Sequence, residues 1–242
     1  MMAVLVIGQT RIPYEVRYSE RARKKRIVVT AAGGVDVVAP VGTPEDDVAG
    51  YVHGKRRWIF DSVNEVTEQH SRVVTERWAS GAKVEFHGRA LMLDVNPGDV
   101  PRVQIRMRSK FHVAVPAGLE GAARGEAVGT AFEAWLRDRA ETDMLRLGRV
   151  YEAALGVTAT AYRLSDAKAR WGSCGRDGVV RVHWRLVQAP VMAFEYVVAH
   201  ELVHLSHRNH SPGFWSALTR VMADWRERKA GLERWEGERR GV

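Results

Sequence analysis

Short apolar runs with strand-like alternation fill the first half of the chain. β-Branched residues are frequent in these runs, and glycine or proline separates them at turn-like spacing, which predicts a β-rich region. The Gly33-Gly34 pair predicts a hairpin turn. Thr43-Pro44-Glu45 predicts the start of a helix, with an N-cap and a proline in its first turn, that extends to about Glu68. The expected strands are Val4–Ile7, Tyr14–Tyr18, Arg26–Thr30, Val35–Ala39, Lys83–Phe86, Leu91–Val95, Val103–Met107 and His112–Val115.

The second half of the chain changes to helical periodicity. A long amphipathic helix is predicted from about Gly125 to Leu155, with Gly156 as its C-cap. Its candidate core residues are Val128, Phe132, Trp135, Leu136, Leu145, Leu147 and Tyr151. Beyond it we expect strands at Ala159–Leu164 and Val179–Val187, a loop through Trp171–Cys174, and helices at about Val191–Ser206 and Pro212–Ala230.

No linker, low-complexity segment or internal repeat is evident between the two halves. We therefore predict one α+β unit over residues 1–242, in which a β-rich half, 1–118, packs on a second half, 119–242. Hydrophobic residues make up 45% and charged residues 27% of the chain, which suits a globular protein and argues against disorder. No apolar stretch approaches the length of a membrane span, so no membrane partner is expected.

The start of the chain and its cysteine content favour a cytoplasmic location. Residues 1–16 have no basic region before their short apolar run, so we interpret them as a first strand and not as a signal peptide. Cys174 is the single cysteine, which excludes an intramolecular disulfide and fits a reducing compartment. The net charge of +8 favours anionic partners such as nucleic acid or nucleotides, although charges spread along a chain are equally typical of a solvated basic surface.

A His-Glu-x-x-His pattern on a predicted helix carries the clearest chemistry. His200 and His204 are four positions apart, so both side chains lie on one face and can bind one zinc ion. Glu201 then lies beside the metal without ligating it, where it can take a proton from zinc-bound water. The alternative is a pair of surface histidines, but the neighbouring residues are apolar all round the helix and predict burial.

A catalytic zinc site needs a third protein ligand. His210 lies six residues beyond His204, at the distance found in metzincins, although His207 replaces the glycine expected in their turn. The competing candidates are Asp224 and Glu227 on the following helix, and Asp224 can alternatively accept a hydrogen bond from a histidine ligand. His207 itself is expected to face solvent at the helix end.

Three groups of motifs resemble the YgjP-like metallopeptidase family, which is distantly similar to SprT-like and WLM zinc peptidases. They are His200–Leu205 with Asn209–Trp215, Arg170–Cys174 with Trp184–Leu186, and the pattern of Ser19–Ile59. The resemblance implies a zincin-like catalytic second half with an active-site helix, zinc ligation by His200, His204 and His210, and general-base work by Glu201. The segment Ala223-Asp224-Trp225 departs from the family's Pro-Asp-Tyr and lacks its helix-breaking proline.

The Trp171–Cys174 segment and the strand after it are candidates for the wall of a cleft. Zincin active-site helices lie under an edge strand that pairs with extended substrate, and Val179–Val187 is the candidate for that strand. Cys174 is expected to be a small buried hydrophobe and not a zinc ligand. Arg170, Arg181 and Arg185 are candidates to stabilise an oxyanion or bind phosphate, but each is more often a solvated residue.

Three functions agree with these patterns. The first is a zinc-dependent hydrolase, most simply a metallopeptidase acting on a peptide or protein, with water activated by Glu201. The second keeps the metal but attacks a nucleotide phosphoanhydride. The third is a basic nucleic-acid-associated module with structural zinc, which three histidines and an adjacent glutamate argue against because structural sites are usually rich in cysteine.

Overall fold

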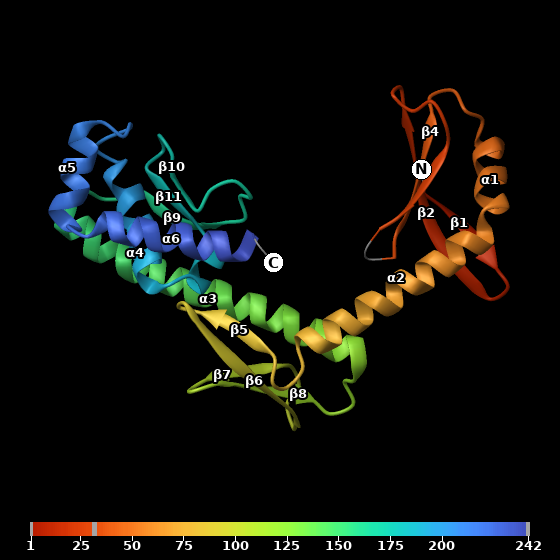
Figure 1. The fold of residues 1–242 in the computed structure, drawn as a ribbon, viewed down its shortest axis with the longest axis horizontal. Coiled ribbons are helices and arrows are strands. Elements are labelled where there is room, and N and C mark those ends of the chain that lie inside the picture. Colours follow the sequence, from red (N-terminus) through yellow and green to blue (C-terminus); the bar gives the residue numbers. More distant parts are fainter. Residues whose placement is uncertain (1, 31–32, 241–242) are drawn as a thin grey trace. The chain divides into compact units, whose positions relative to one another are not determined.

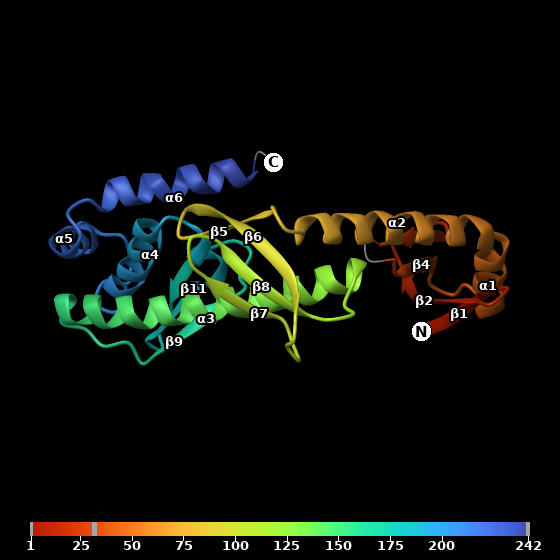
Figure 2. The same ribbon diagram turned by 90° about the horizontal axis from the view of Figure 1, so that it is seen from below.

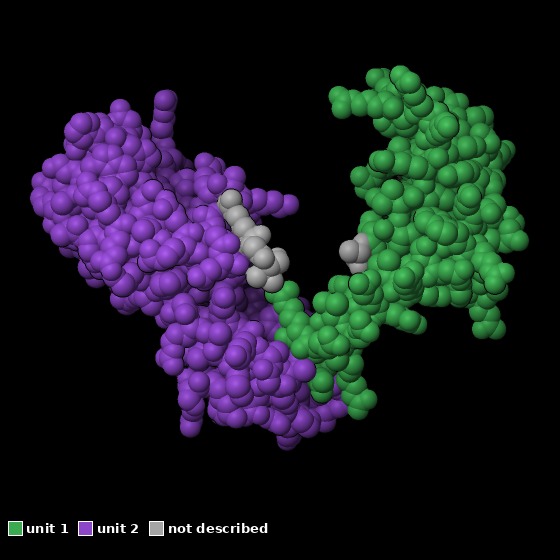
Figure 3. All heavy atoms as spheres, in the orientation of Figure 1, with its two compact units in different colours: residues 1–77, 120–125 green, residues 78–119, 126–242 purple. Residues whose placement is uncertain are grey.

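The computed structural model describes residues 2–30 and 33–240 and confirms the α+β class (Figures 1 and 2). The chain divides into two compact units. Unit 1 is Met1–Arg77 with Glu120–Gly125, and unit 2 is Trp78–Leu119 with Glu126–Val242 (Figure 3). This boundary differs from the sequence-based division at residue 118, because the second set of strands shares its core with the C-terminal helices. No helix in the described part of the chain is long and apolar enough to cross a bilayer.

Unit 1 is a four-stranded sheet with two helices on one face. Its strands follow the order β1-β2-β4-β3, in which β2 and β4 are parallel and the outer pairs antiparallel. Alternate strand residues point into a core that Val48, Val52 and Ile59 of the helices close. Gly33, with φ of +77°, lies in the predicted turn between β3 and β4. The elements are β1 (Met2–Ile7), β2 (Thr10–Ser19), β3 (Arg26–Val29), β4 (Val35–Pro40), α1 (Glu45–Gly54) and α2 (Arg56–Arg77).

The single helix expected between Pro44 and about Glu68 is wrong, since two helices occupy the segment. Gly54, a poor helix former, ends α1, and Lys55 takes φ of −100° before α2 begins and runs on to Arg77. The predicted side-chain N-cap is also wrong. The hydroxyl of Thr43 donates to the Pro40 carbonyl at 2.8 Å instead of capping the helix.

The first sheet of unit 2 repeats the topology of unit 1, a repeat that is not evident in the sequence. Its order is β5-β6-β8-β7, again with a parallel central pair between antiparallel outer pairs, and α3 follows as α2 follows the first sheet. Even the alternating burial of β4 recurs in β8. The predicted strands are confirmed as β5 (Lys83–Phe86), β6 (Arg89–Gly98), β7 (Gln104–Met107) and β8 (Phe111–Pro116).

The long helix α3 (Gly121–Leu155) is confirmed and ends where Gly156, with φ of +68°, donates its N–H to the Glu152 carbonyl. Its buried face includes the predicted Val128, Phe132, Leu136 and Leu147, while Trp135 and Tyr151 are half-buried. Leu145 is wrong as a core residue, because it is 38% exposed. Met144, the residue before it, lies on the buried face of the helix instead and is 1% exposed.

A second, three-stranded sheet and three helices complete unit 2. The sheet has the order β10-β11-β9, with β11 parallel to β9 and antiparallel to β10. The large core of unit 2 joins both sheets to α3 and to the helices α4, α5 and α6. These elements are β9 (Ala161–Ser165), β10 (Gly172–Cys174), β11 (Val179–His183), the 3-10 helix η1 (Trp184–Gln188), α4 (Val191–Val203), α5 (Pro212–Val221) and α6 (Trp225–Arg240).

Three sequence-based boundaries in this region are wrong. The predicted strand Val179–Val187 ends at His183, and the predicted loop contains the short strand β10. The predicted helix Pro212–Ala230 breaks at Met222, whose extended backbone (φ −150°, ψ 83°) lets its side chain fill the core at 3% exposure. The chain therefore turns here even without the family's proline.

Candidate metal centre

The helix α4 is apolar on nearly every face and lies inside unit 2. Pro190 precedes it, and nine of its thirteen residues are buried. Glu201 is 7% exposed and is the one charged residue that is buried in the described part of the chain. A charge this deep needs a partner or a function, because removing a carboxylate from water is costly.

Three histidines converge where α4 ends and α5 begins. His204 occupies the C-cap of α4, and His210 lies in the turn that leads to Pro212, the first residue of α5. One ring nitrogen from each of His200, His204 and His210 lies within 4.8 Å of the other two. The Nε2 atoms of His200 and His210 are 2.9 Å apart. The turn therefore brings the third predicted histidine back to the helix pair.

In each of the two helix histidines, Nδ1 has its own hydrogen-bond partner, which leaves Nε2 free to face the other histidines. His204 Nδ1 lies 2.9 Å from the backbone carbonyl of His207, and His200 Nδ1 lies 3.4 Å from the Tyr196 hydroxyl. Such outer partners fix the ring orientation of histidine ligands. Phe214 lies beneath all three rings, with centroid distances between 4.7 and 4.8 Å.

The electrostatics of the two helix histidines, His200 and His204, favour the neutral imidazole. Burial, reinforced by the nearby histidines, lowers the pKa of His200 to about 3, and burial also lowers the pKa of His204. Neutral rings keep a lone pair for a metal ion, and three imidazoles are a common ligand set for catalytic zinc. The donor set and its spacing therefore fit a single zinc ion.

Glu201 lies next to this cluster but is not one of its ligand-forming members. Burial raises the pKa of the Glu201 carboxyl to about 7, against opposing effects of the Arg170 charge and a hydrogen bond from the Cys174 backbone. Gly172 of β10 packs directly on it, since a Cβ at that position would lie 2.6 Å from Glu201 Oε1. The carboxylate, one residue beyond His200 in α4, is therefore held against the edge of the second sheet.

The chain is similar to a known family of metallopeptidases. The model of the YgjP-like metallopeptidase domain matches residues 23–235. This chain belongs to the YgjP-like metallopeptidase family. No curated protein matches the chain. Among solved structures, the metallopeptidase zymogen abylysin of Pyrococcus abyssi matches at 19% identity with a TM-score of 0.35, over 39% of this chain and 93% of that one.

The acidic alternatives for the third ligand of this YgjP-like enzyme lie elsewhere. Asp224 accepts a 2.9 Å hydrogen bond from Arg228 Nε, and the same guanidinium also pairs with Glu195. Neither Asp224 nor the exposed Glu227 belongs to the histidine cluster, and Asp224 has no contact with a histidine among the described residues. The structure thus brings His210, and neither acid, to His200 and His204.

The cysteine and two of the three candidate arginines also have other partners. Cys174 packs against the core, burial raises the pKa of its thiol, and it is not part of the metal-ligating group. Arg181 pairs with Asp177 at 3.0 Å, and the guanidinium of Arg185 lies over the Trp184 ring. Arg170 is exposed, and its charge reaches Glu201.

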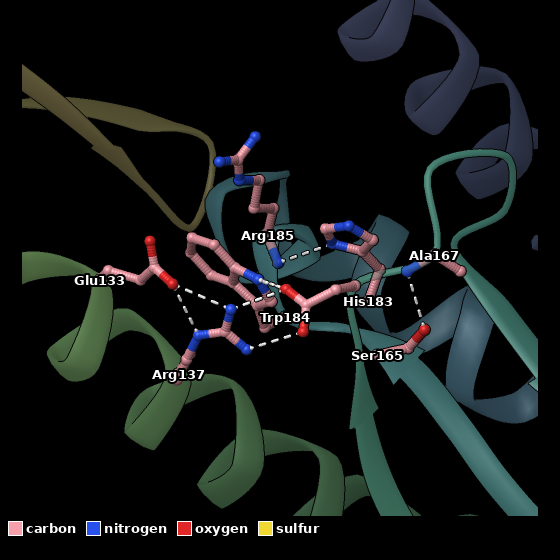
Figure 4. Close-up of polar contacts among 8 residues, drawn as sticks. Glu133, Arg137, Ser165, Ala167, His183, Trp184 and Arg185 are labelled. Carbon is pink, nitrogen blue, oxygen red and sulfur yellow. Dashed lines mark hydrogen bonds and ion pairs between the residues drawn. The ribbon is translucent and has the colours of Figure 1, made fainter. Parts of the chain in front are cut away.

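A polar network ties the second sheet to α3 (Figure 4). Trp184 of η1 donates its indole N–H to Asp166 at 2.9 Å, and Arg137 of α3 donates to both Asp166 and Glu133. The same guanidinium lies 4.6 Å from the centre of the Trp184 ring. The tryptophan of the family's second motif therefore anchors the segment that precedes α4.

Proposed function

We propose that this chain is a zinc-dependent peptidase in which His200, His204 and His210 hold the metal and Glu201 is the general base. The observation that carries the proposal is the convergence of three imidazoles beside one buried carboxylate. A zinc ion in such a site polarises the scissile carbonyl and makes its bound water acidic.

The position of Glu201 supports its proposed role in proton transfer. It follows His200 in α4, so its side chain leaves the helix about 100° away from that ligand and faces the wall made by Gly172. In this role it accepts the proton of the attacking water and delivers it to the leaving amine. Tyr196 and the His207 carbonyl keep the rings of His200 and His204 oriented.

The second sheet offers an edge for substrate, but it is not the strand expected from the sequence. β11 is wrong as the edge strand, because β10 and β9 flank it on both sides. β10 is an edge strand, and it is also the strand that packs on Glu201. An extended peptide can add to the outer edge of β10 by strand addition, a common mode of peptide recognition. Such a peptide would run past the general base.

Metal content and cleavage together test this proposal. The purified protein should carry about one zinc per chain, and His204→Ala should lose it. Glu201→Gln should keep the zinc, fold normally and cleave unfolded casein roughly 10²–10⁴-fold more slowly, since it cannot accept a proton. Full zinc in His204→Ala, or an active Glu201→Gln protein, would contradict the assignment.

A panel of nucleoside triphosphates and a DNA-binding titration serve as the matched comparisons. Phosphate release without casein cleavage would replace the peptidase by a phosphohydrolase. DNA binding that weakens steeply with salt would add a nucleic-acid partner. We expect peptide cleavage, because Arg181 and Arg185 are engaged elsewhere. The single cysteine supports the proposal that the enzyme works in the reducing cytoplasm.

A further inference from the structure

A groove outside the metal centre lies between strand β7 and the first half of α3. Its volume is about 820 Å³, and its lining is mostly apolar. Ile105 of β7 forms one wall, and Trp135 with the small residues Ala127, Ala131 and Ala134 of α3 forms the other. Because these alanines recur at helical spacing, they leave a continuous channel along one face of the helix.

The strand side of this groove has unused hydrogen-bonding capacity. β7 is an edge strand, and no other strand in the described parts of the chain pairs with its outer edge. Unpaired N–H and C=O groups of an edge strand are a template for another extended chain. The repeated topology supplies a comparison: the equivalent edge strand of unit 1, β3, packs against α2, whereas β7 makes fewer close approaches to α3 and lines the open groove with it.

The charges that line the groove have one sign. Arg102 and Arg106 both contribute to the lining, and no carboxylate does. Neither arginine has an ion pair within the described residues. A strand that docks here gains from acidic side chains next to these guanidinium groups, because opposite charges complement each other across an interface.

We infer that this groove binds an extended acidic peptide by strand addition to β7. Side chains on one face of the bound strand pack into the alanine channel of α3, while the alternate face carries the carboxylates that meet Arg102 and Arg106. Binding does not require the metal centre. The groove can also dock substrate segments that are remote from the cleaved bond. This role rests on the proposed peptidase function.

Fluorescence anisotropy with a labelled peptide tests the binding directly. The probe is a peptide of about eight residues that alternates valine and glutamate, long enough to cover β7 at roughly 3.3 Å per residue. The full-length, zinc-loaded Glu201→Gln protein prevents cleavage of the probe. A second probe with lysine in place of glutamate should bind about tenfold more weakly, because two ion pairs are replaced by like charges.

Two groove variants and a matched control separate this site from general charge effects. Arg102→Glu with Arg106→Glu should weaken the acidic probe about tenfold, whereas Arg149→Glu with Arg163→Glu makes the same change in net charge at exposed sites and should leave affinity within about twofold. Ala134→Trp, at an exposed helix position, should block the channel without unfolding the protein.

Specific outcomes would overturn the inference. Equal binding of both probes, equal losses in both double variants, or unchanged binding by Ala134→Trp each place the peptide elsewhere. An oligothymidylate that binds more tightly than the acidic probe would assign the surface to nucleic acid. A dimer that dissociates in the Ala134→Trp variant and binds no probe would assign it to a second copy of the chain.

Discussion

Replacing Gly172 by alanine should separate the position of Glu201 from its chemistry. A Cβ at Gly172 would lie 2.6 Å from Glu201 Oε1 and 2.8 Å from Val197 Cγ1. To reach an ordinary contact of 3.4 Å, the carboxylate must retreat by about 0.8 Å. A misplacement of about 1 Å costs on the order of 10²-fold in rate, so kcat for casein should fall by about that factor. Overpacking should also cost about 1–3 kcal/mol of stability.

The test compares this variant with Gly98→Ala, which adds the same methyl group to another strand. There the new Cβ meets Ala114 Cβ at an ordinary 3.4 Å, and neither glycine has a positive φ. We expect Gly98→Ala to cleave casein normally, and Gly172→Ala to keep its zinc because the atoms nearest to the Gly172 Cβ position belong to Glu201 and Val197 and not to a histidine. If Gly172→Ala matches Gly98→Ala in kcat while Glu201→Gln is inactive, the packing of β10 does not place the base, and the reasoning is refuted.

Two further predictions concern supporting contacts. Tyr196→Phe removes the hydroxyl near His200 Nδ1 and should lower zinc affinity by about tenfold. Competition with a chromogenic chelator measures this affinity, and an unchanged value would show that the hydroxyl does not support His200 as a ligand. Asp166→Ala should lower the thermal midpoint, because it leaves the indole N–H of Trp184 unpaired. The hydrogen bond with Arg137 lowers the pKa of Asp166, so the ionised carboxylate stabilises the fold above the usual carboxyl pKa, and this contribution is lost as the pH falls through the lowered value. The thermal midpoint of Asp166→Ala should therefore fall less steeply in acid than that of the unmodified protein. Identical dependence of the two midpoints on pH would contradict this.

The convergence of the histidines could largely be predicted from the sequence, because helix geometry determines what four-residue spacing does. His200 and His204 share a face of α4 for that reason, and the short distance to Pro212 limits where His210 can lie. The supporting contacts were not predictable. The carbonyl of His207 is a backbone group with no sequence signature, and only the pairing of β10 with β11 brings Gly172 to Glu201.

Strand positions were predicted well, because alternating burial leaves a period-two pattern in the sequence. Breaks between helices are harder to predict where the local sequence favours a helix but core packing ends it. At Met222, for example, the side chain enters the core and α5 ends. The repeated topology is hard to see in the sequence, because β4 and β8 share their alternation of buried positions but only two of six aligned residues, Val37 with Val113 and Pro40 with Pro116. A sheet order is a property of pairing between distant segments, which a single sequence does not display.

The turn between β5 and β6 has a consequence for folding. The N–H groups of His87 and Gly88 donate to the carbonyls of Val187 and Gln188, immediately before the helix that carries Glu201, and Gly88 lies against Pro190. These bonds join residues 100 positions apart, so a large loop must close before that helix is anchored at its start. Assembly of the histidines should consequently be a late event, and a fragment that begins after β8 would lack the anchor. An excised version of residues 119–242 would therefore have to retain the hairpin to keep these contacts.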